Sequence, residues 1–459
     1  MRKSIVLLVI SFFLSMIGKS QGYEHILNQI ISPSFPEKTF VITDYGAIAK
    51  FNFDSRKAIQ TAIDECSKSG GGKVIIPSGN FFTSGSIFLK NNVNLHLEEN
   101  AHIKFGRNYK NYLPNVKVRW AGTICYNYSP LIYAYQQKNI AITGKGTLDG
   151  NNPVLKSWLW AILAIGESSK IREAGENGTP HNERIFGHVP GNKKHKKYHF
   201  RPTFIEFYEC ENILLSDFLL TKTRFWSIHP VFSQNITIRN ITIKNNIVND
   251  DGIDPDGCKN VLIENCTIKT IDDCIAVKSG RDRDGWDNKP CENIIVRNCS
   301  LHSGGYPLCV GSDMSGGVKN FYMENCKINF GFHAGFSVKA NLDRGGTVEN
   351  IYINGLTIKK VHKAAFDFRM NYPGYRGHNF PPKYKDILIE NVNCEKVKGY
   401  GIRIRGVENT TVDNISFKNI TINKVQKPVL IYQGKNISAK NVKIEGVPVD
   451  KIINTNTKN

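Results

Sequence analysis

Apolar and polar residues alternate along most of the chain in short units that open with the same residue type. Each unit starts with Asn and continues with alternating, mostly apolar residues, which is the pattern of a short β-strand. Units of this kind begin at Asn139, Asn212, Asn235, Asn260, Asn293, Asn320, Asn350 and Asn436. Most recur at roughly 22–33 residues, within the range typical of solenoid repeats. The pattern therefore predicts a stack of strand-built coils.

No helical pattern separates these units, so we expect an all-β, single-domain, right-handed parallel β-helix. A β-propeller is the alternative, but each blade needs four antiparallel strands, and these units are too short for that. The leading Asn is expected to occupy a turn that tolerates a left-handed backbone and to bond its equivalents in the next coil. Equivalent positions then lie about 4.8 Å apart, so residues one repeat apart can form one site.

Two segments depart from the repeat. The pattern over residues 54–66 predicts a short capping helix at the N-terminal end of the solenoid, with Asp54 as N-cap and Ile59 and Ile63 on one face. Residues 151–200 break the repeat and are expected to form a loop insertion. The basic run 193–197 within it is either a solvated loop or a rim that attracts a polyanion.

The start of the chain resembles a leader sequence. Arg2 and Lys3 precede an apolar run over residues 5–17, which is followed by small and polar residues up to Gln21. This order is typical of a secretory signal peptide, and the run is short for a membrane span. We expect residues 1–21 to be a signal peptide, residues 22–459 to be the β-helix domain, and the protein to be secreted or periplasmic. An uncleaved anchor is the alternative.

The net charge limits the class of binding partner that we expect. Sixty Lys and Arg against 40 Asp and Glu give a net charge of +20, which favours nucleic acid, anionic lipid or an acidic polysaccharide. Export disfavours nucleic acid, and no membrane span is expected after signal cleavage. An acidic polysaccharide is therefore the expected partner, bound by a monomer. The eleven cysteines are interpreted as small buried residues, although one or two disulfides, for example at Cys291, stay open.

The densest group of acids lies in two successive units. Asp251 belongs to the first, and Asp272 and Asp273 belong to the second, so stacking brings the three together. Like charges at this range raise at least one carboxyl pKa, leaving an acid beside a base, as glycosidic hydrolysis requires. A calcium site is the alternative, but the spacing does not match the EF-hand loop. We expect neither a metal nor a cofactor.

Several short motifs carry a family resemblance. They are Tyr45-Gly46-Ala47, Gly70-Gly71-Gly72, Gly144–Gly150, Arg201-Pro202, Phe225–Pro230, Asn249-Asp250-Asp251, Asp272-Asp273 and Gly311–Gly317. On these motifs the chain resembles glycoside hydrolase family 28, the polygalacturonase family, over nearly its whole mature length. The resemblance implies inverting hydrolysis, with Asp272 as general acid, Asp251 and Asp273 positioning and activating water, and Asn249 supporting the site. The segment Gly311–Gly317 resembles one common in exo-acting members.

The chain departs from the family pattern at two positions. A family His should fall near Gly305-Tyr306-Pro307, and the family Arg-Ile-Lys appears here as Ser337-Val338-Lys339. The resemblance implies substrate-binding roles for Tyr306, for Lys339 as the surviving carboxylate-binding cation, and for Tyr372. His302, His333, Arg344 and Arg369 are candidates to replace the missing groups, and for each of them a packing or surface role is the simpler interpretation.

These observations predict a secreted, inverting, exo-acting glycoside hydrolase that cleaves a pectin or galacturonan type of acidic polysaccharide. The two departures keep open a hydrolase of rhamnogalacturonan or of a sulfated glycan. A polysaccharide lyase on the same fold and an inactive glycan-binding β-helix protein are the alternatives outside hydrolysis.

Overall fold

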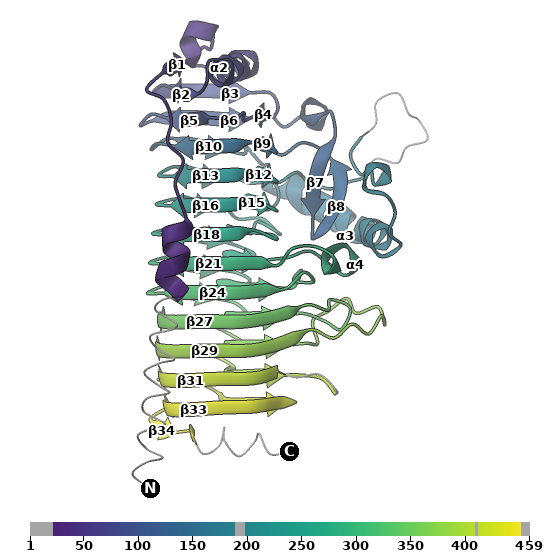
Figure 1. Cartoon of the computed structure of the whole chain (residues 1–459), viewed down its shortest axis with the longest axis vertical. Helices are drawn as coiled ribbons and strands as arrows, with labels where there is room; N and C mark the ends of the chain where they lie inside the picture. Colours follow the sequence, from purple (N-terminus) through teal and green to yellow (C-terminus); the bar gives the residue numbers. More distant parts are fainter. Residues whose placement is uncertain (1–21, 189–197, 409–411, 451–459) are drawn as a thin grey trace.

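A computed structural model of the chain describes residues 22–188, 198–408 and 412–450. The signal-peptide prediction for residues 1–21 and the basic run 193–197 lie outside these residues. The described strands stack into a long parallel β-helix, with most of its helices at one end and along one flank (Figure 1). Within these three ranges, no helix has both the length and the apolar character needed to cross a bilayer.

A 22-stranded sheet winds around most of the solenoid. Its strands are β1 (Thr39–Val41), β2 (Gly72–Ile76), β3 (Gly79–Thr83), β5 (Val93–Leu97), β6 (Ala101–Phe105), β10 (Lys138–Thr143), β11 (Thr147–Asp149), β13 (Glu211–Ser216), β14 (Leu219–Thr221), β16 (Gln234–Arg239), β17 (Thr242–Lys244), β18 (Lys259–Glu264), β19 (Thr267–Thr270), β21 (Cys291–Arg297), β22 (Ser300–Ser303), β24 (Val318–Glu324), β25 (Lys327–Gly331), β27 (Thr347–Ile358), β29 (Lys383–Cys394), β31 (Val412–Ile422), β33 (Gly434–Ile444) and β34 (Val447–Pro448). All of its pairings are parallel except β33 with β34.

The remaining face of the solenoid is built from two shorter parallel sheets. One contains β4 (Ile87–Phe88), β9 (Ile132–Tyr135), β12 (Ile205–Tyr208) and β15 (Ile228–Val231). The other contains β20 (Ile275–Val277), β23 (Leu308–Gly311), β26 (Ala334–Lys339), β28 (Ala364–Arg369), β30 (Tyr400–Arg405) and β32 (Lys427–Tyr432). Single bridges from Ile228 to Ile253 and from Ile253 to Ile275 join the two sheets.

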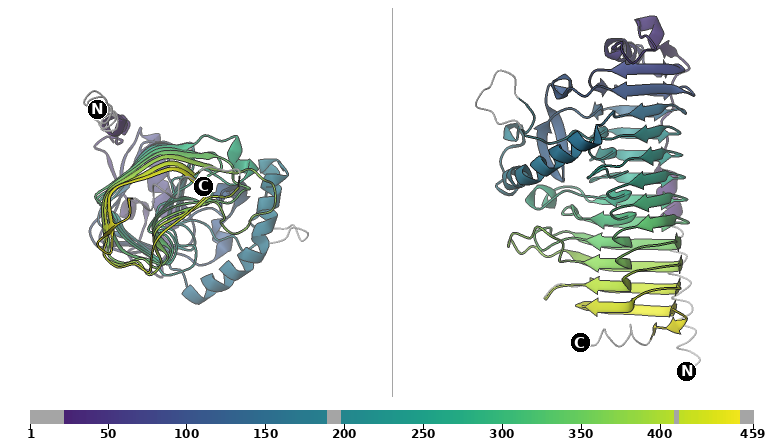
Figure 2. Two further views of the ribbon diagram at one scale, coloured as in Figure 1. Left: turned by 90° about the horizontal axis from the view of Figure 1, so that it is seen from below. Right: turned by 180° about the vertical axis from the view of Figure 1, so that it is seen from behind.

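The other elements lie at the N-terminal end and on the flank. They are α2 (Arg56–Lys68), α3 (Val154–Glu176), α4 (Arg283–Trp286), the 3₁₀ turns η1 (Ile42–Tyr45), η2 (Tyr109–Tyr112) and η3 (His181–Glu183), and the antiparallel pair β7 (Val116–Trp120) and β8 (Thr123–Asn127). Two views turned from that of Figure 1 show α3 lying across this flank of the coils (Figure 2).

The Asn residues act as the repeat predicts. Asn260 and Asn293 have φ of 57° and 60°, the left-handed region that Asn tolerates better than most residues. Asn293 Nδ2 donates to Asn260 Oδ1 at 2.9 Å, and Asn320 Nδ2 donates to Asn293 Oδ1 at 2.9 Å. The ladder satisfies polar groups that the turns would otherwise leave buried, and it holds the register of successive coils.

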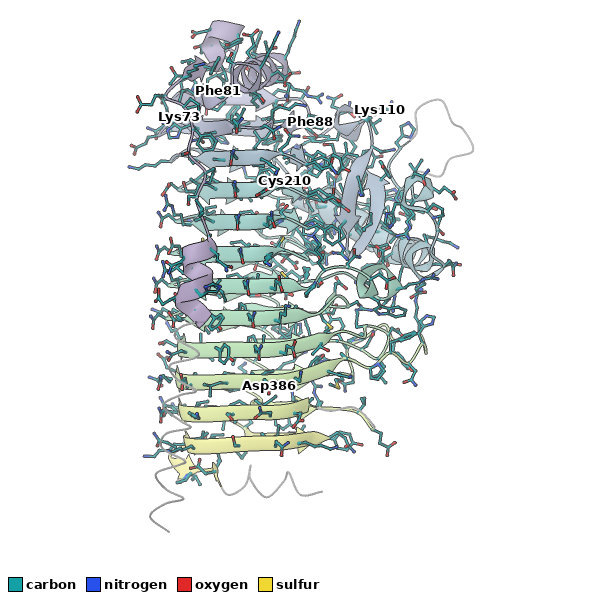
Figure 3. The ribbon with its side chains drawn as sticks, in the orientation of Figure 1. Lys73, Phe81, Phe88, Lys110, Cys210 and Asp386 are labelled. Carbon is teal, nitrogen blue, oxygen red and sulfur yellow. The ribbon has the colours of Figure 1, made fainter. Side chains whose placement is uncertain are left out.

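The interior is one continuous apolar column of stacked Ile, Val, Leu and Phe side chains. Phe81 and Cys210, both labelled in Figure 3, belong to it. All eleven cysteines are buried and none forms a disulfide, which confirms their interpretation as small buried residues and answers the open question about Cys291. A helix of residues 22–29 lies along β18, β21 and β24 (Figure 1), where Ile26 packs against Leu262 and Ile295.

Two sequence predictions need correction. The capping helix α2 begins at Arg56 with Ser55 as N-cap, while Asp54 caps from one residue earlier by accepting a bond from the Arg56 backbone N–H at 3.1 Å. The insertion 151–200 is not all loop, because α3 fills 23 of its residues. Apolar residues lie on both its buried and its exposed sides, so the sequence lacks the single apolar stripe by which an amphipathic helix is recognised.

Candidate active site

The three predicted acids meet on the face formed by the two shorter sheets. They lie where single bridges replace a full strand between β15 and β20. The backbone N–H of Gly252 donates to the Asp273 carbonyl at 2.9 Å, which sets the turn of Asp251 beside that of Asp272 and Asp273. A cleft of about 230 Å³ opens there, and its lining includes all three acids together with Asn249, Lys339 and Tyr372.

Asp272 is held in place through its neighbours. Its backbone N–H donates to Asp250 Oδ1 at 2.8 Å, and its Oδ2 accepts from Asn249 Nδ2 at 3.2 Å. Arg201 in turn donates to Asn249 Oδ1 at 2.9 Å. Burial raises the pKa of Asp272, and the charge of Asp273 raises it further. Asp272 therefore keeps its proton to higher pH than an ordinary Asp does.

Asp273 has the opposite electrostatic environment. Lys339 Nζ donates to its Oδ2 at 2.6 Å, and the Tyr306 backbone N–H donates to its Oδ1 at 2.9 Å. Burial opposes ionisation, but Lys339 and Lys278 outweigh it, and the pKa of Asp273 is lowered. Cys309 Sγ adds a contact of 3.3 Å to the same carboxylate. The two neighbouring carboxyls are thus displaced in opposite directions, with the pKa of Asp272 raised and that of Asp273 lowered.

Asp251 completes the group. Its Oδ2 lies 3.3 Å from Lys278 Nζ, while its Oδ1 is buried without a hydrogen-bond partner in the structure. Burial raises the pKa of Asp251 well above its ordinary value, as do the charges of Asp254 and Asp272. The unpartnered oxygen is available to hold a water molecule or a substrate hydroxyl in the cleft.

The predicted substrate-binding residues are brought together at the same place. Lys339 is 4% exposed, and its Nζ lies 4.0 Å from the centre of the Tyr306 ring and 5.6 Å from that of Tyr372. Its charge is already engaged by Asp273, which the sequence did not indicate. Tyr306 is buried and contributes its backbone N–H to Asp273, and the Tyr372 ring forms part of the cleft lining.

The four candidates for the missing groups lie in different surroundings. The His333 ring packs on Tyr306 with centroids 4.7 Å apart, and burial together with Lys363 lowers its pKa to about 4. His302 packs on Phe330, and Arg344 is buried against Asp282 and Asp313. Arg369 lies beside the cleft, 5.3 Å from the Tyr372 ring centre.

Several further residues of the cleft lining were not predicted as site residues, and four of them have side chains that can contact a sugar. They are Trp226, Arg201, Lys278 and Arg281. Lys278 Nζ lies 4.2 Å from the centre of the Trp226 ring, so the cation that pairs with Asp251 also covers an aromatic face. Arg201 and Trp226 fall inside the quoted family motifs, and Lys278 follows the Asp pair within the same strand unit, where the alternation places it outward. The motifs and the alternation are therefore the sequence signals that could have identified these three residues.

Helix α3 crosses the cleft. Near its start Ser157 bonds to Asn152. Near its end Arg172 donates to Asp282 Oδ2 at 2.6 Å, to Asp343 Oδ2 at 2.9 Å and to the Gly374 carbonyl at 2.6 Å. These three acceptors follow β20, β26 and β28. Residues of α3 from 161 to 168 and the turn between β7 and β8 line the cleft, so the insertion forms part of its wall.

The residues that the structure describes contain no group of three or more His, Cys, Asp or Glu side chains arranged to hold a metal ion. The absence of a metal requirement stays a prediction. The available chemistry is that of the carboxyl groups themselves, with the pKa of Asp272 raised, the pKa of Asp273 lowered and an unpartnered Asp251 oxygen facing the same cleft.

Comparisons with known proteins bear on the family and on the fold. The sequence model described as "Glycosyl hydrolases family 28" matches residues 186–401. A probable polygalacturonase of Vitis vinifera is 29% identical over 84% of this chain and 74% of its own length. The exo-poly-alpha-D-galacturonosidase of Dickeya chrysanthemi is 22% identical over 90% and 75%.

A solved structure gives the strongest match among these. The crystal structure of a hyperthermoactive exopolygalacturonase from Thermotoga maritima has 35% sequence identity and a TM-score of 0.88, covering 93% of this chain and 96% of that one. The shared architecture confirms the predicted right-handed parallel β-helix.

Proposed function

The chain belongs to glycoside hydrolase family 28, and we propose that it hydrolyses galacturonan-type pectin from one end of the polymer with inversion at the anomeric carbon. The observation that carries this proposal is the pair of adjacent carboxyls whose environments displace their pKa values in opposite directions, Asp272 upward and Asp273 downward. Such a pair supplies an acid and a base at the same pH.

The proposed reaction uses three side chains. Asp272 donates its proton to the glycosidic oxygen, and the bond from that oxygen to the anomeric carbon breaks. A water molecule attacks the anomeric carbon from the opposite face and gives its proton to Asp273. Asp251 Oδ1 helps to hold this water. One proton leaves the acid and one reaches the base, so exchange with solvent restores both groups for the next cycle.

The crossing helix supports action at a chain end. An endo-acting enzyme needs a groove open at both ends, so that a polymer can lie across the reacting groups. Here α3, which is part of the insertion, reaches across to the loops after β20, β26 and β28. Its side chains line the cleft. A polymer can then enter with one end only, which favours the release of short products.

Product analysis on polygalacturonate tests substrate, mode of action and stereochemistry together. We expect mono- or digalacturonate as the first products, a slow fall in viscosity relative to new reducing ends, and inverted anomers in proton NMR of the first product. Activity should survive excess chelator. Longer early oligomers would contradict exo action, and a retained anomer would contradict inversion. A product absorbing in the ultraviolet that requires calcium would favour a lyase.

We also propose that the protein is exported and acts as a monomer. The order of charged, apolar and small residues over 1–21 supports export, and residues 22–29 already pack on β18, β21 and β24 as part of the folded domain. Mass spectrometry of the protein recovered outside the cytoplasm should give a mature N-terminus close to residue 22. Recovery of the uncleaved chain would contradict this, and a dimer mass in solution would contradict the monomer.

A further inference from the structure

A single lysine lies behind Asp251 and is shared by two carboxylates. Lys278 Nζ lies 3.3 Å from Asp251 Oδ2 and 3.9 Å from Asp254 Oδ2, and it covers the Trp226 ring at 4.2 Å. The bridge between Asp256 and Lys278 aligns the two coils that carry these groups. Lys278 is 3% exposed and Asp254 is fully buried, so water screens their interaction only weakly.

The other acids near Lys278 and its two carboxylates have partners of their own. Each has one at 2.6–3.3 Å: Asp273 with Lys339, Asp313 with Arg281, Asp256 with Arg119 and His229, and Asp272 with Asn249. Arg201 feels the charge of Asp251 from further away but bonds to Asn249. Among the residues that the structure describes, Lys278 is the only cation in ion-pair contact with Asp251 or with Asp254.

Asp254 holds Lys278 by charge alone. Both of its carboxyl oxygens are buried without a hydrogen-bond partner in the structure, and 3.9 Å is too long for a direct hydrogen bond to Nζ. Burial raises the pKa of Asp254 to about 7, although the charges of Lys278 and His229 lower it. A buried carboxyl group without hydrogen bonds is costly and rare, which points to a use at the lysine that it faces.

Lys278 determines which oxygen of Asp251 is free. Oδ2 of Asp251 accepts a hydrogen bond from Nζ, whereas Oδ1 has no partner, and the side chain belongs to the cleft lining. The Trp226 ring and Asp254 both lie against the ammonium group and so restrict where it can lie. Because one oxygen is held from behind, the other stays available to the water in the cleft.

We propose that Lys278 is a positioning residue for Asp251 and that Asp254 holds Lys278 in place. The ammonium group bonds one oxygen of Asp251 and leaves the other for the attacking water. This rests on the proposed function for the reaction that Asp251 serves. Asp254 is not part of the cleft lining, so its influence on the reaction passes through Lys278 and Asp251.

The first test measures kcat, KM and their pH dependence on polygalacturonate for Lys278→Met. Losing a charge-assisted hydrogen bond should lower kcat about 10- to 150-fold, with KM little changed, because the bond orients a group used in the chemical step. Asp251 also loses its only ion-pair cation and takes up a proton more readily. The acid limb of kcat/KM should therefore move to higher pH by about one pH unit or more.

Asp254→Asn should move the same limb the other way. Burial raises the pKa of Asp251 most, the charge of Asp254 adds to this, and Lys278 opposes it. The amide keeps the shape of Asp254 but removes its charge, so Lys278 serves Asp251 alone and the limb moves to lower pH. A purely structural role would lower the melting temperature without displacing the limb in opposite directions.

Asp149→Asn is the matched control. Asp149 is buried and pairs with Lys222 at 3.0 Å on the earlier coils, so this variant also loses a buried carboxylate beside a lysine. Its acid limb should stay where it is in the unaltered protein. Near-normal kcat in Lys278→Met, or displacement of the limb in the same direction in Lys278→Met and Asp254→Asn, would overturn the proposal.

Carbon-13 NMR of the Asp carboxyl groups separates this inference from the proposed function, because it needs no substrate. The Asp251 signal is assigned as the one missing in Asp251→Asn. If no galacturonan is hydrolysed but the Asp251 titration moves up in Lys278→Met and down in Asp254→Asn, the role of Lys278 stands and the proposed function fails. An Asp251 titration that neither variant moves overturns the inference. If Lys278→Met does not fold, Asp254→Asn decides by the same criterion.

Discussion

Replacing Asp272 by Asn is expected to lower kcat on polygalacturonate by about 10²–10⁴-fold, the usual contribution of a positioned general acid. The amide has nearly the same shape but carries no transferable carboxyl proton. The Asn249 bond to Oδ2 and the Asp250 bond to the backbone N–H are both available to the substituted residue. The loss should therefore appear in the chemical step, with the fold and the melting temperature preserved.

The pH profile gives this prediction a second readout. Because burial and Asp273 raise the pKa of Asp272, its proton persists above the ordinary range of an Asp, and the alkaline limb of kcat/KM should report its loss. Residual activity in Asp272→Asn should lack that limb. Asp287→Asn, an exposed residue next to α4, is the control. Near-normal turnover in Asp272→Asn would remove Asp272 from the acid role.

The solenoid could be predicted because its signal is local and repeated. Each unit carries its own alternation and its own Asn, so one template, once found, sets the register of all coils. The cluster of Asp251, Asp272 and Asp273 followed from the same reasoning, since residues one repeat apart must become neighbours. This explains why the backbone and the acids were both foreseen without knowledge of any single contact.

The parts that were missed depend on contacts far apart in the sequence. Arg172 meets Asp282 and Asp343 across separations of 110 and 171 residues, and nothing in the insertion's own pattern indicates those partners. The closed cleft is therefore a property of the fold and not of a motif.

For Lys339, the role that the sequence motif predicts differs from the role that its contacts in the structure indicate. The resemblance implies a cation that grips the substrate carboxylate. In the structure this cation is bonded to Asp273 at 2.6 Å and is almost fully buried. His333 cannot supply a replacement charge at neutral pH, because its pKa is lowered to about 4. We therefore expect Lys339 to act first on the ionisation of Asp273.

If Lys339 acts on the ionisation of Asp273, replacing it by Met should change both the stability of the fold and the pH dependence of that stability. Breaking one side of a buried ion pair typically costs about 3–5 kcal/mol. Because Lys339 holds the pKa of Asp273 below its ordinary value, the pair stabilises the folded state above that ordinary value, and the contribution is lost as pH falls through the lowered pKa. The loss in melting temperature should accordingly be largest at neutral pH and smaller in acid.

The same substitution should move the acid limb of kcat/KM to higher pH, since Asp273 without Lys339 takes up a proton more readily and no longer serves as base. Lys363→Met, which removes an exposed lysine before β28, is the control and should change neither quantity. Comparing polygalacturonate with its carboxyl-reduced form isolates any direct contact with substrate. If the melting temperature and the acid limb are unchanged and kcat/KM falls only on the anionic polymer, Lys339 binds the substrate carboxylate instead.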